Sequence, residues 1–232
     1  MQTPLAVEAV GLSQHVSSSD KPLVILQDLD LAVPQGERLA IVGRSGSGKS
    51  TLLGLLAGLD SPTAGKVRID GVEISALDED GRAAIRGKRM GFVFQSFQLM
   101  PSLTALENVM LPLQLAGRDD ALVQAEAALK RVDLADRLTH YPRQLSGGEQ
   151  QRVAIARAFA PSPSILFADE PTGNLDAVTG QHVIDLLFSL NAEAGTTLVL
   201  VTHDVALASR CERTLTLQAG RLGVADMTGA IV

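Results

Sequence analysis

Short runs of apolar residues recur along the chain, and glycine-, serine- and charge-rich turns separate them. Strands are predicted for RLAIV at 38–42, KVRID at 66–70, MGFVF at 90–94, SILFA at 164–168 and TTLVLVT at 196–202. Most of these runs are apolar throughout rather than alternating. Such runs between helices indicate a parallel sheet that is covered on both faces.

Helical spacing of apolar residues occupies much of the chain between these strands. Helices are expected over residues 49–57, 79–87, 105–115, 121–132 and 178–191, and another after Ser146 that ends at Pro161 and Pro163. Gly58 is a plausible C-cap for the first helix. Pro101 and Pro112 punctuate the mainly helical stretch at about 96–160.

Composition narrows the class of protein. The 232 residues are 46% hydrophobic, which is typical of one folded domain with a sizeable core. The net charge is −6 and the basic residues are scattered, which argues against a nucleic-acid partner. The short cluster of Arg86, Lys88 and Arg89 is interpreted as a solvated helix end.

The single cysteine, Cys211, excludes a disulfide within the chain and is expected to be a small buried hydrophobe. The N-terminal sequence lacks the basic and apolar regions of a signal peptide. The longest apolar stretch, Leu52 to Leu59, is far shorter than the roughly 20 residues that span a bilayer. We therefore expect a cytoplasmic chain whose membrane role, if any, comes through a partner.

A phosphate-binding loop is predicted where GRSGSGKS follows the strand at 38–42 and opens a helix. The segment fits G-x-x-x-x-G-K-[ST], in which backbone N–H groups and the helix N-terminus surround phosphate. Lys49 should reach the β- and γ-phosphates, and Ser50 should ligate Mg²⁺. The expected nucleotide-binding residues of this segment are Gly43, Arg44, Ser45, Gly46, Ser47, Gly48, Lys49, Ser50 and Thr51.

An acidic pair follows the apolar strand ILFA. Asp169 and Glu170 should lie at the carboxyl edge of the sheet, where open α/β sheets bind ligands. Asp169 is predicted to meet the Mg²⁺ ion. Glu170 is predicted to polarise the attacking water. General-base catalysis of this kind typically raises the reaction rate by about 10²–10⁴-fold.

A third motif, LSGGEQQR at 145–152, has the S-x-x-E pattern of a capping box from Ser146 to Glu149. Gly147 and Gly148 lower the stability of the first helical turn. Their presence suggests that another group approaches the backbone N–H groups, as at an anion site. Because the chain already has one phosphate loop, this second site suggests two chains that face each other.

Along the chain, the phosphate loop, LSGGEQQR and ILFADEP follow in this order, and together they resemble the nucleotide-binding subunits of ABC transporters over nearly the whole chain. The resemblance implies an α/β P-loop NTPase that forms a single domain, 1–232. It would have a RecA-like core at about 1–95 and 161–232, a small antiparallel β part and a helical subdomain at about 96–160. GFVFQSFQLMPSLTALENVMLPL and FADEPTGNLD are most similar to the LolD/MacB group, and VAIARAF and LLFSLN to YbbA-type subunits.

Further residues are assigned by the resemblance. Gln95 matches the glutamine that senses Mg²⁺ and the γ-phosphate, and His203 matches the histidine that contacts the γ-phosphate. Asp176 matches an aspartate that crosses the dimer interface. The catalytic set is therefore Glu170, His203 and Lys49. The metal ligands are Ser50, Gln95 and Asp169. Ser146, Gly147, Gly148, Gln95 and Asp176 complete the nucleotide site.

The resemblance also implies ATP and Mg²⁺ as cofactors and a homodimer that works with a separate integral-membrane permease. The chain would lie on the cytoplasmic face of the inner membrane and act in the export or release of hydrophobic or lipidic molecules. Residues 96–113 and Tyr141 to Gln144 would dock the permease. An ABC-type regulatory module that switches a membrane partner without transport remains an alternative.

The sequence departs from the family at one position. An aromatic residue that stacks on adenine is expected near Gln14, and His15 is the nearest ring. Adenine would then be held weakly, by His15 or by an apolar side chain, and use of GTP is conceivable. ABC ATPases of DNA repair or translation fit less well. The former carry a long coiled-coil insertion and the latter two cassettes, and this chain shows neither.

Overall fold

A computed structural model of the chain describes residues 3–16 and 23–224. The chain divides into two compact units, Met1–Arg82 with Val199–Val232 and Ala83–Leu198. The division falls within α2 (Glu79–Arg89) and β8 (Thr197–Thr202). The predicted helical subdomain at 96–160 lies wholly inside the second unit.

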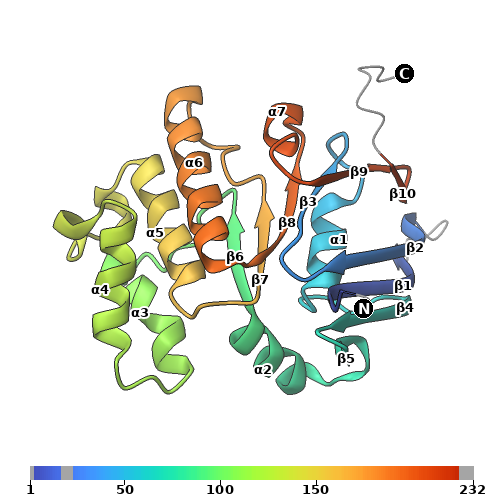
Figure 1. Cartoon of the computed structure of the whole chain (residues 1–232), viewed down its shortest axis with the longest axis horizontal. Coiled ribbons are helices and arrows are strands. Elements are labelled where there is room, and N and C mark those ends of the chain that lie inside the picture. The colour runs from blue at the N-terminus through green and yellow to red at the C-terminus, as the bar shows by residue number, and fades with distance from the viewer. Residues whose placement is uncertain (1–2, 17–22, 225–232) are drawn as a thin grey trace. The chain divides into compact units, whose positions relative to one another are not determined.

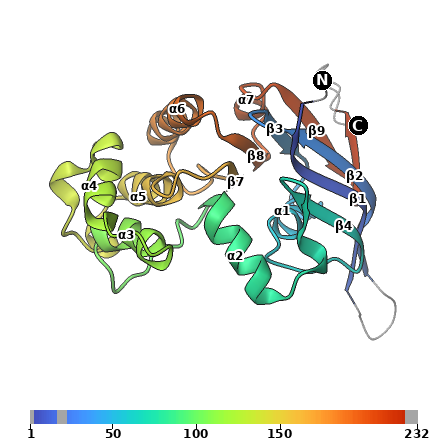
Figure 2. The ribbon, with the colours of Figure 1, turned by 60° about the horizontal axis from the view of Figure 1, so that its bottom comes forward.

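The first unit contains a four-stranded antiparallel sheet in the order β2-β1-β4-β5, whose strands are all labelled in Figure 1 and of which Figure 2 labels β2, β1 and β4. Its strands are β1 (Leu5–Val16), β2 (Leu23–Pro34), β4 (Ala64–Ile69) and β5 (Val72–Glu73). Buried and exposed residues alternate over Leu29–Val33, as expected for a sheet with one covered face. This is the small antiparallel β part that the family resemblance implied.

A second set of strands in this unit carries the phosphate loop. β3 (Arg38–Val42) pairs in parallel with β9 (Arg213–Gln218), and β10 (Arg221–Val224) pairs antiparallel to β9. The interior of β3 is fully buried, which explains its apolar sequence. α1 (Lys49–Leu56) follows the loop, and the short α7 (Val205–Ala208) contacts β3. The 3-10 turn η1 (Ile74–Ala76) packs on β4.

The second unit is built around α5 (Gly147–Phe159), which contacts β6, α3, α4 and α6 (Figure 1). The parallel strands β6 (Met90–Phe94) and β7 (Ile165–Asp169) pair directly. The helices are α3 (Ala105–Leu115), α4 (Ala121–Arg131) and α6 (Ala177–Ala194), with 3-10 turns η2 (Ala135–Arg137) and η3 (Pro142–Gln144). Eight buried residues of α5 supply much of this unit's core.

The predicted elements agree with the structure at most positions. The strands at 38–42 and 90–94 and the helix at 105–115 have the expected bounds. The C-cap of α1 is Ala57, and Gly58 follows it with a positive φ of 64°. Pro112 was expected to punctuate the helical stretch, but it lies inside α3 and does not end that helix. β1, β2, β9, β10 and α7 were not predicted.

Within the described residues, no helix combines the length and the apolarity that a bilayer crossing requires. The longest helix, α6, has 18 residues and includes polar side chains on its exposed face.

Candidate functional site

The phosphate loop owes its path to three glycines, one of which has no room for a Cβ and two of which have a left-handed backbone. A Cβ at Gly43 would lie 2.5 Å from the carbonyl oxygen of Leu217. Gly46 and Gly48 have φ angles of 78° and 97°, a region that residues with a Cβ rarely adopt. Gly48 also packs closely on the side chains of Ile25 and Leu26 in β2. The loop is therefore fixed against the sheets of the first unit.

Lys49 is only 8% exposed, although it is the first residue of α1. Its ammonium group donates hydrogen bonds to the carbonyl oxygens of Gly43 at 2.8 Å and Arg44 at 3.2 Å. The cation is thus held over its own loop by two backbone carbonyls, neither of which is a carboxylate. Ser47 Oγ is buried and has no hydrogen-bond partner within the described residues. Both groups can serve an incoming anion.

The start of α1 is electrostatically suited to phosphate. Gly48 is the N-cap and makes no side-chain cap, and the first turn carries no acidic side chain. Its unpaired N–H groups and the positive end of the helix dipole are therefore not neutralised locally. Ser50 is exposed at this helix start and Thr51 is half-buried, so both predicted residues lie at the loop.

His203 follows β8 in the same unit and is exposed. The residues on both sides hold it in place. Asp204 N–H donates to Thr202 Oγ1 at 3.0 Å, and the Asp204 carboxylate caps α7 by accepting from the N–H groups of Ala206 and Leu207. Since α7 contacts β3, the strand that leads into the phosphate loop, the fold fixes where His203 stands in this unit.

The second unit brings Gln95 and the acidic pair to neighbouring strand ends. Phe94 pairs with Asp169 in the parallel register of β6 and β7. Gln95 and Glu170 are therefore the first residues beyond the same edge of this strand pair. This places an amide oxygen and two carboxylates at one strand edge, and oxygen donors of this kind suit Mg²⁺.

Glu170 has a positive φ of 46°, an uncommon conformation for a non-glycine residue. Its carbonyl accepts from Gly173 N–H at 3.0 Å, so the chain turns immediately after the strand. Asp176 lies at the end of this turn and caps α6 by accepting from the N–H groups of Val178 and Thr179. The hydrogen bond from the Thr179 side chain, together with those from the backbone N–H groups, holds the pKa of Asp176 below its usual value.

The third motif forms the predicted capping box. Ser146 Oγ accepts from Glu149 N–H at 3.3 Å, and Glu149 Oε2 accepts from Ser146 N–H and from Ser146 Oγ–H at 2.8 Å each. Glu149 Oε1 also accepts from Arg137 Nε at 2.9 Å. The bonds from Ser146, assisted by Arg137, lower the pKa of Glu149 to about 2.

Packing inside the chain is a second reason for a glycine at position 148, beside the predicted approach of another group. A Cβ at Gly148 would overlap the methyl group of Thr179 in α6. One at Gly147 would lie 3.2 Å from Leu175 Cδ2. Close packing between the starts of α5 and α6 therefore accounts for Gly148 without any external group. Gly147 and Gly148 still present the N–H groups of a helix start.

Three residues with a bearing on this site were missed from the sequence. Gln151 is a buried amide on α5, Arg157 donates to the carbonyls of Phe97 and Gln98, and Asn174 bonds to Gln95. Burial lowers the pKa of Arg157. For Gln151, the sequence did contain a signal. This polar residue shares a helix face with the apolar Ile155, which indicates a buried amide.

The adenine position stays a prediction. The side-chain oxygen of Gln14 accepts hydrogen bonds from Thr63 N–H and Oγ1–H, so it fastens β1 to the turn before β4. His15 is exposed and pairs with Val24 across the strands. Of these two residues, His15 has the side chain that is free to face a base.

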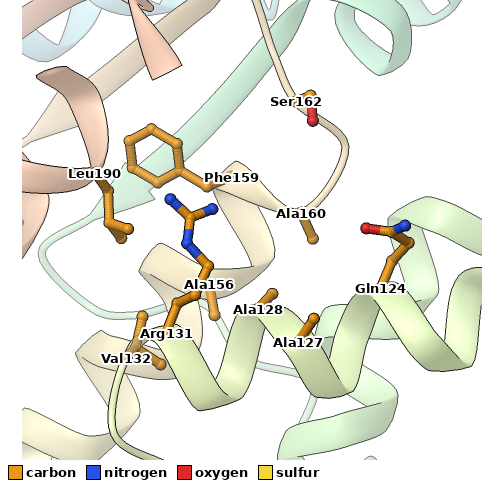
Figure 3. A pocket seen from close by; sticks show the side chains of 10 residues that line it. All are labelled: Gln124, Ala127, Ala128, Arg131, Val132, Ala156, Phe159, Ala160, Ser162 and Leu190. Atoms are coloured by element: carbon orange, nitrogen blue, oxygen red, sulfur yellow. The ribbon is translucent and has the colours of Figure 1, made fainter. Parts of the chain in front are cut away.

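Figure 3 shows a shallow cavity of about 90 Å³ among α4, α5 and α6. Small alanine side chains line much of it, and its one cation, Arg131, is paired with Glu193. Ligand pockets typically hold about 300–1,000 Å³. No residue of the three motifs lines the cavity, so it is not the functional site.

Comparison with known proteins agrees with these motifs. The family model described as "ABC transporter" matches residues 26–173, well over half of the chain. The chain belongs to the ABC transporter family. It is an ABC-type ATPase, and it has the ABC ATPase fold.

Relatives of this ABC protein match it almost end to end. It is 55% identical over 218 residues to the uncharacterized ABC transporter ATP-binding protein YbbA of Escherichia coli strain K12, covering 93% of this chain and 96% of YbbA. It is 48% identical over 224 residues to the lipoprotein-releasing system ATP-binding protein LolD of Shewanella oneidensis, covering 96% of each. It is thus an ATP-binding subunit of the YbbA and LolD kind.

A solved structure supports the same fold. The ATP-binding cassette MJ0796, in a dimeric post-hydrolysis state bound to ADP and phosphate, matches with a TM-score of 0.88 at 42% identity. The match covers 97% of this chain and 100% of that one.

Proposed function

We propose that two copies of this chain close on ATP and that hydrolysis, by separating them, drives a membrane-embedded permease. The observation that carries the proposal is the 42% identity and TM-score of 0.88 to a cassette seen as a dimer with ADP and phosphate. In support, the start of α5 offers N–H groups at Gly147 and Gly148 behind an exposed Ser146. Such a helix start can bind the γ-phosphate held by another copy.

Each residue has a distinct role in this proposal. Lys49 and the loop N–H groups bind the β- and γ-phosphates. Glu170 orients the attacking water, and His203 donates a hydrogen bond to a phosphate oxygen. Positioning and charge stabilisation of this kind supply most of the rate in phosphoryl transfer.

Mg²⁺ fits the donors that this chain offers. Ser50, Gln95 and Asp169 provide hydroxyl, amide and carboxylate oxygens, and the pairing of Phe94 with Asp169 brings the last two to the same strand edge. When bound, the ion would offset the negative charge of the phosphates.

The permease is proposed to dock on a surface of the second unit formed by residues 96–103 and Tyr141. Met100 is 48% exposed and Tyr141 38%. The fully buried Asn108 holds this segment rigid, because its amide donates to the carbonyls of Met100, Leu103 and Thr104. A firm, partly apolar surface suits a partner helix.

The location and cargo follow from the same relatives. We place the chain on the cytoplasmic face of the inner membrane as a peripheral subunit. The name of the LolD relative, a lipoprotein-releasing system, supports a hydrophobic or lipidic substrate that the permease handles.

The dimer proposal is tested with Glu170→Gln. The variant should bind ATP, hydrolyse it at a rate lower by about 10²-fold or more, and elute as a dimer only with Mg-ATP. Glu126→Gln, an exposed glutamate on α4, is the matched control and should behave as the parent chain. A Glu170→Gln chain that stays monomeric with Mg-ATP contradicts the proposal.

Docking is tested by co-purification from membranes. Met100→Asp should lose the permease while the isolated chain keeps its ATPase rate. Leu115→Asp is the control, since Leu115 is 81% exposed in the same unit but outside the proposed surface. Equal retention of the permease by both variants would rule out this docking surface.

A further inference from the structure

Gln151 is a polar side chain in the interior of the second unit. It lies on α5, is fully buried, and has buried Val153, Ala154 and Ile155 beside it in the sequence. Its amide nitrogen donates to the carbonyl oxygen of Pro171 at 2.5 Å and to that of Phe94 at 3.3 Å. One side chain therefore bridges two segments that are 77 residues apart (94 and 171).

These two carbonyls flank the predicted catalytic groups. Phe94 is the last residue of β6 and precedes Gln95, and Pro171 directly follows Glu170. Phe94 also pairs with Asp169 in the strand register. The amide of Gln151 thus ties together the places where the chain leaves β6 and β7, next to Gln95 on one side and Glu170 on the other.

The oxygen of the same amide does not contribute a hydrogen bond to the described part of the fold. Gln151 Oε1 is buried and accepts no hydrogen bond within the described residues. An unpaired buried acceptor lowers stability, and an apolar side chain of similar size would avoid that cost but would leave the carbonyls of Phe94 and Pro171 without this donor. The position of a glutamine here is explained by its two donated bonds rather than by packing.

The same helix holds the segment after Gln95 at a second point. The Arg157 guanidinium donates to the carbonyls of Gln98 at 2.6 Å and Phe97 at 2.9 Å, and both residues have positive φ angles. Because α5 begins at the LSGGEQQR motif, it connects that motif rigidly to the ends of β6 and β7.

We propose that Gln151 is a positioning residue that sets the placement of Gln95 relative to Glu170, and so the rate of ATP hydrolysis but not the affinity for nucleotide. The inference rests on the proposed roles of Gln95 and Glu170. Nucleotide affinity should be spared because the phosphate loop belongs to the other unit. A displacement of about 1 Å in a catalytic group can lower a rate by about 10²-fold.

A second buried amide, Asn191, provides a control that distinguishes a positioning role of Gln151 from a general loss of packing. Asn191 on α6 is 2% exposed, and its amide donates to the carbonyl of Thr196 at 2.6 Å, away from all three motifs. Gln151→Met and Asn191→Leu each keep side-chain size and remove a buried donor. Both should lower the melting temperature, but only Gln151→Met should slow hydrolysis.

The experiment measures kcat for Mg-ATP and the Kd for a fluorescent ADP analogue in the full chain, with Glu170→Gln alongside. We expect Gln151→Met to lower kcat by about 10–100-fold and to leave Kd within about twofold. Gln151→Asn, whose shorter amide cannot reach both carbonyls, should show the same pattern and serves if Gln151→Met does not fold.

Each outcome bears on the inference. If Glu170→Gln is inactive while the Gln151 variants keep the kcat of Asn191→Leu, the positioning role is wrong and the proposed function stands. A parallel loss of kcat and nucleotide affinity would show a general structural role and also overturn it. If Glu170→Gln hydrolyses ATP at the normal rate, the catalytic assignment itself fails.

Discussion

Gln95 and Asn174 exchange two hydrogen bonds across 79 residues of sequence. Gln95 Nε2 donates to Asn174 Oδ1 at 3.1 Å, and Asn174 Nδ2 donates to the carbonyl of Gln95 at 3.0 Å. Gly173 makes room for the pair, since a Cβ there would lie 2.6 Å from Gln95 Nε2. The nitrogen of the Gln95 amide is thereby engaged, which leaves its oxygen as the atom suited to a metal ion.

Asn174→Ala should therefore raise the Mg²⁺ concentration that hydrolysis requires and lower the free energy of unfolding only slightly. The free side chain of Gln95 would no longer be oriented, so we expect the Mg²⁺ concentration for half-maximal hydrolysis to rise several-fold. The lost bonds cost about 1–2 kcal/mol of stability at most. A Mg²⁺ titration at fixed ATP checks this. Gln181→Ala, which removes an exposed bond to Asp185 in the same unit, is the control. Identical Mg²⁺ titrations would contradict the ordering role.

The local parts of this site could be predicted because short-range chemistry determines them. GRSGSGKS lies between a buried strand and a helix, and Ser146 and Glu149 are three residues apart, as a capping box requires. The strands β6 and β7 followed from two apolar runs, although their direct pairing was not predicted. The catalytic roles of Glu170 and His203 stay predictions.

The parts that could not be predicted depend on long-range contacts. Nothing in the spacing of Asn174, Gln151 or Arg157 reveals that their partners lie 20 to 79 residues away. The conflict between Gly148 and Thr179 likewise arises only when α5 and α6 pack. β1 escaped notice because register shifts break its alternation of buried and exposed residues, whereas the alternating stretch Leu29–Val33 of β2 was a sequence signal that was missed.

Lys49→Ala should lose nucleotide binding rather than turnover alone. The ammonium group is nearly buried over the loop, and a charged hydrogen bond contributes about 1.5–3 kcal/mol. We expect affinity for ATP to fall by about 10–100-fold, measured by titration of a fluorescent nucleotide. Lys66→Ala is the control, because Lys66 is an exposed lysine of the same unit. Full affinity in Lys49→Ala would refute the phosphate-loop assignment.

Gly148→Ala should destabilise the chain by about 1–3 kcal/mol, because the added methyl group overlaps Thr179. The double variant Gly148→Ala with Thr179→Ser removes the opposing methyl group and should recover most of that loss. Urea unfolding of the two variants gives the comparison. If the double variant is stable but still cannot dimerise with ATP, the close approach of a phosphate also requires Gly148.

Glu149 gives the capping box a pH dependence. Its pKa is lowered from 4.5 to about 2, so its ionised form stabilises the fold above pH 4.5, and this contribution disappears as pH falls towards 2. The side chain is 20% exposed, so we expect only about 1 kcal/mol. The difference in unfolding free energy between the parent chain and Glu149→Gln should shrink from pH 6 to pH 3. A constant difference would argue against it.

Cys211 should be chemically inert in the folded chain. The residue is half-buried rather than fully buried as expected from the sequence, and desolvation raises the pKa of its thiol to about 12, so at pH 8 only about one molecule in 10⁴ carries the thiolate. A chromogenic disulfide reagent should label the native chain slowly and the denatured chain completely. Rapid stoichiometric labelling of the native chain would show that the thiol is more accessible than its burial indicates.

The left-handed backbone at Glu170 implies a conflict between the thermal stability of the chain and its rate of ATP hydrolysis. Glycine adopts a φ of 46° at little cost and asparagine at less cost than most residues. Glu170→Gly and Glu170→Asn should therefore melt at a higher temperature than the parent while failing to turn over ATP. β-branched replacements should be poorly tolerated. Selection for thermostability alone would then favour losing the very carboxylate that hydrolysis needs.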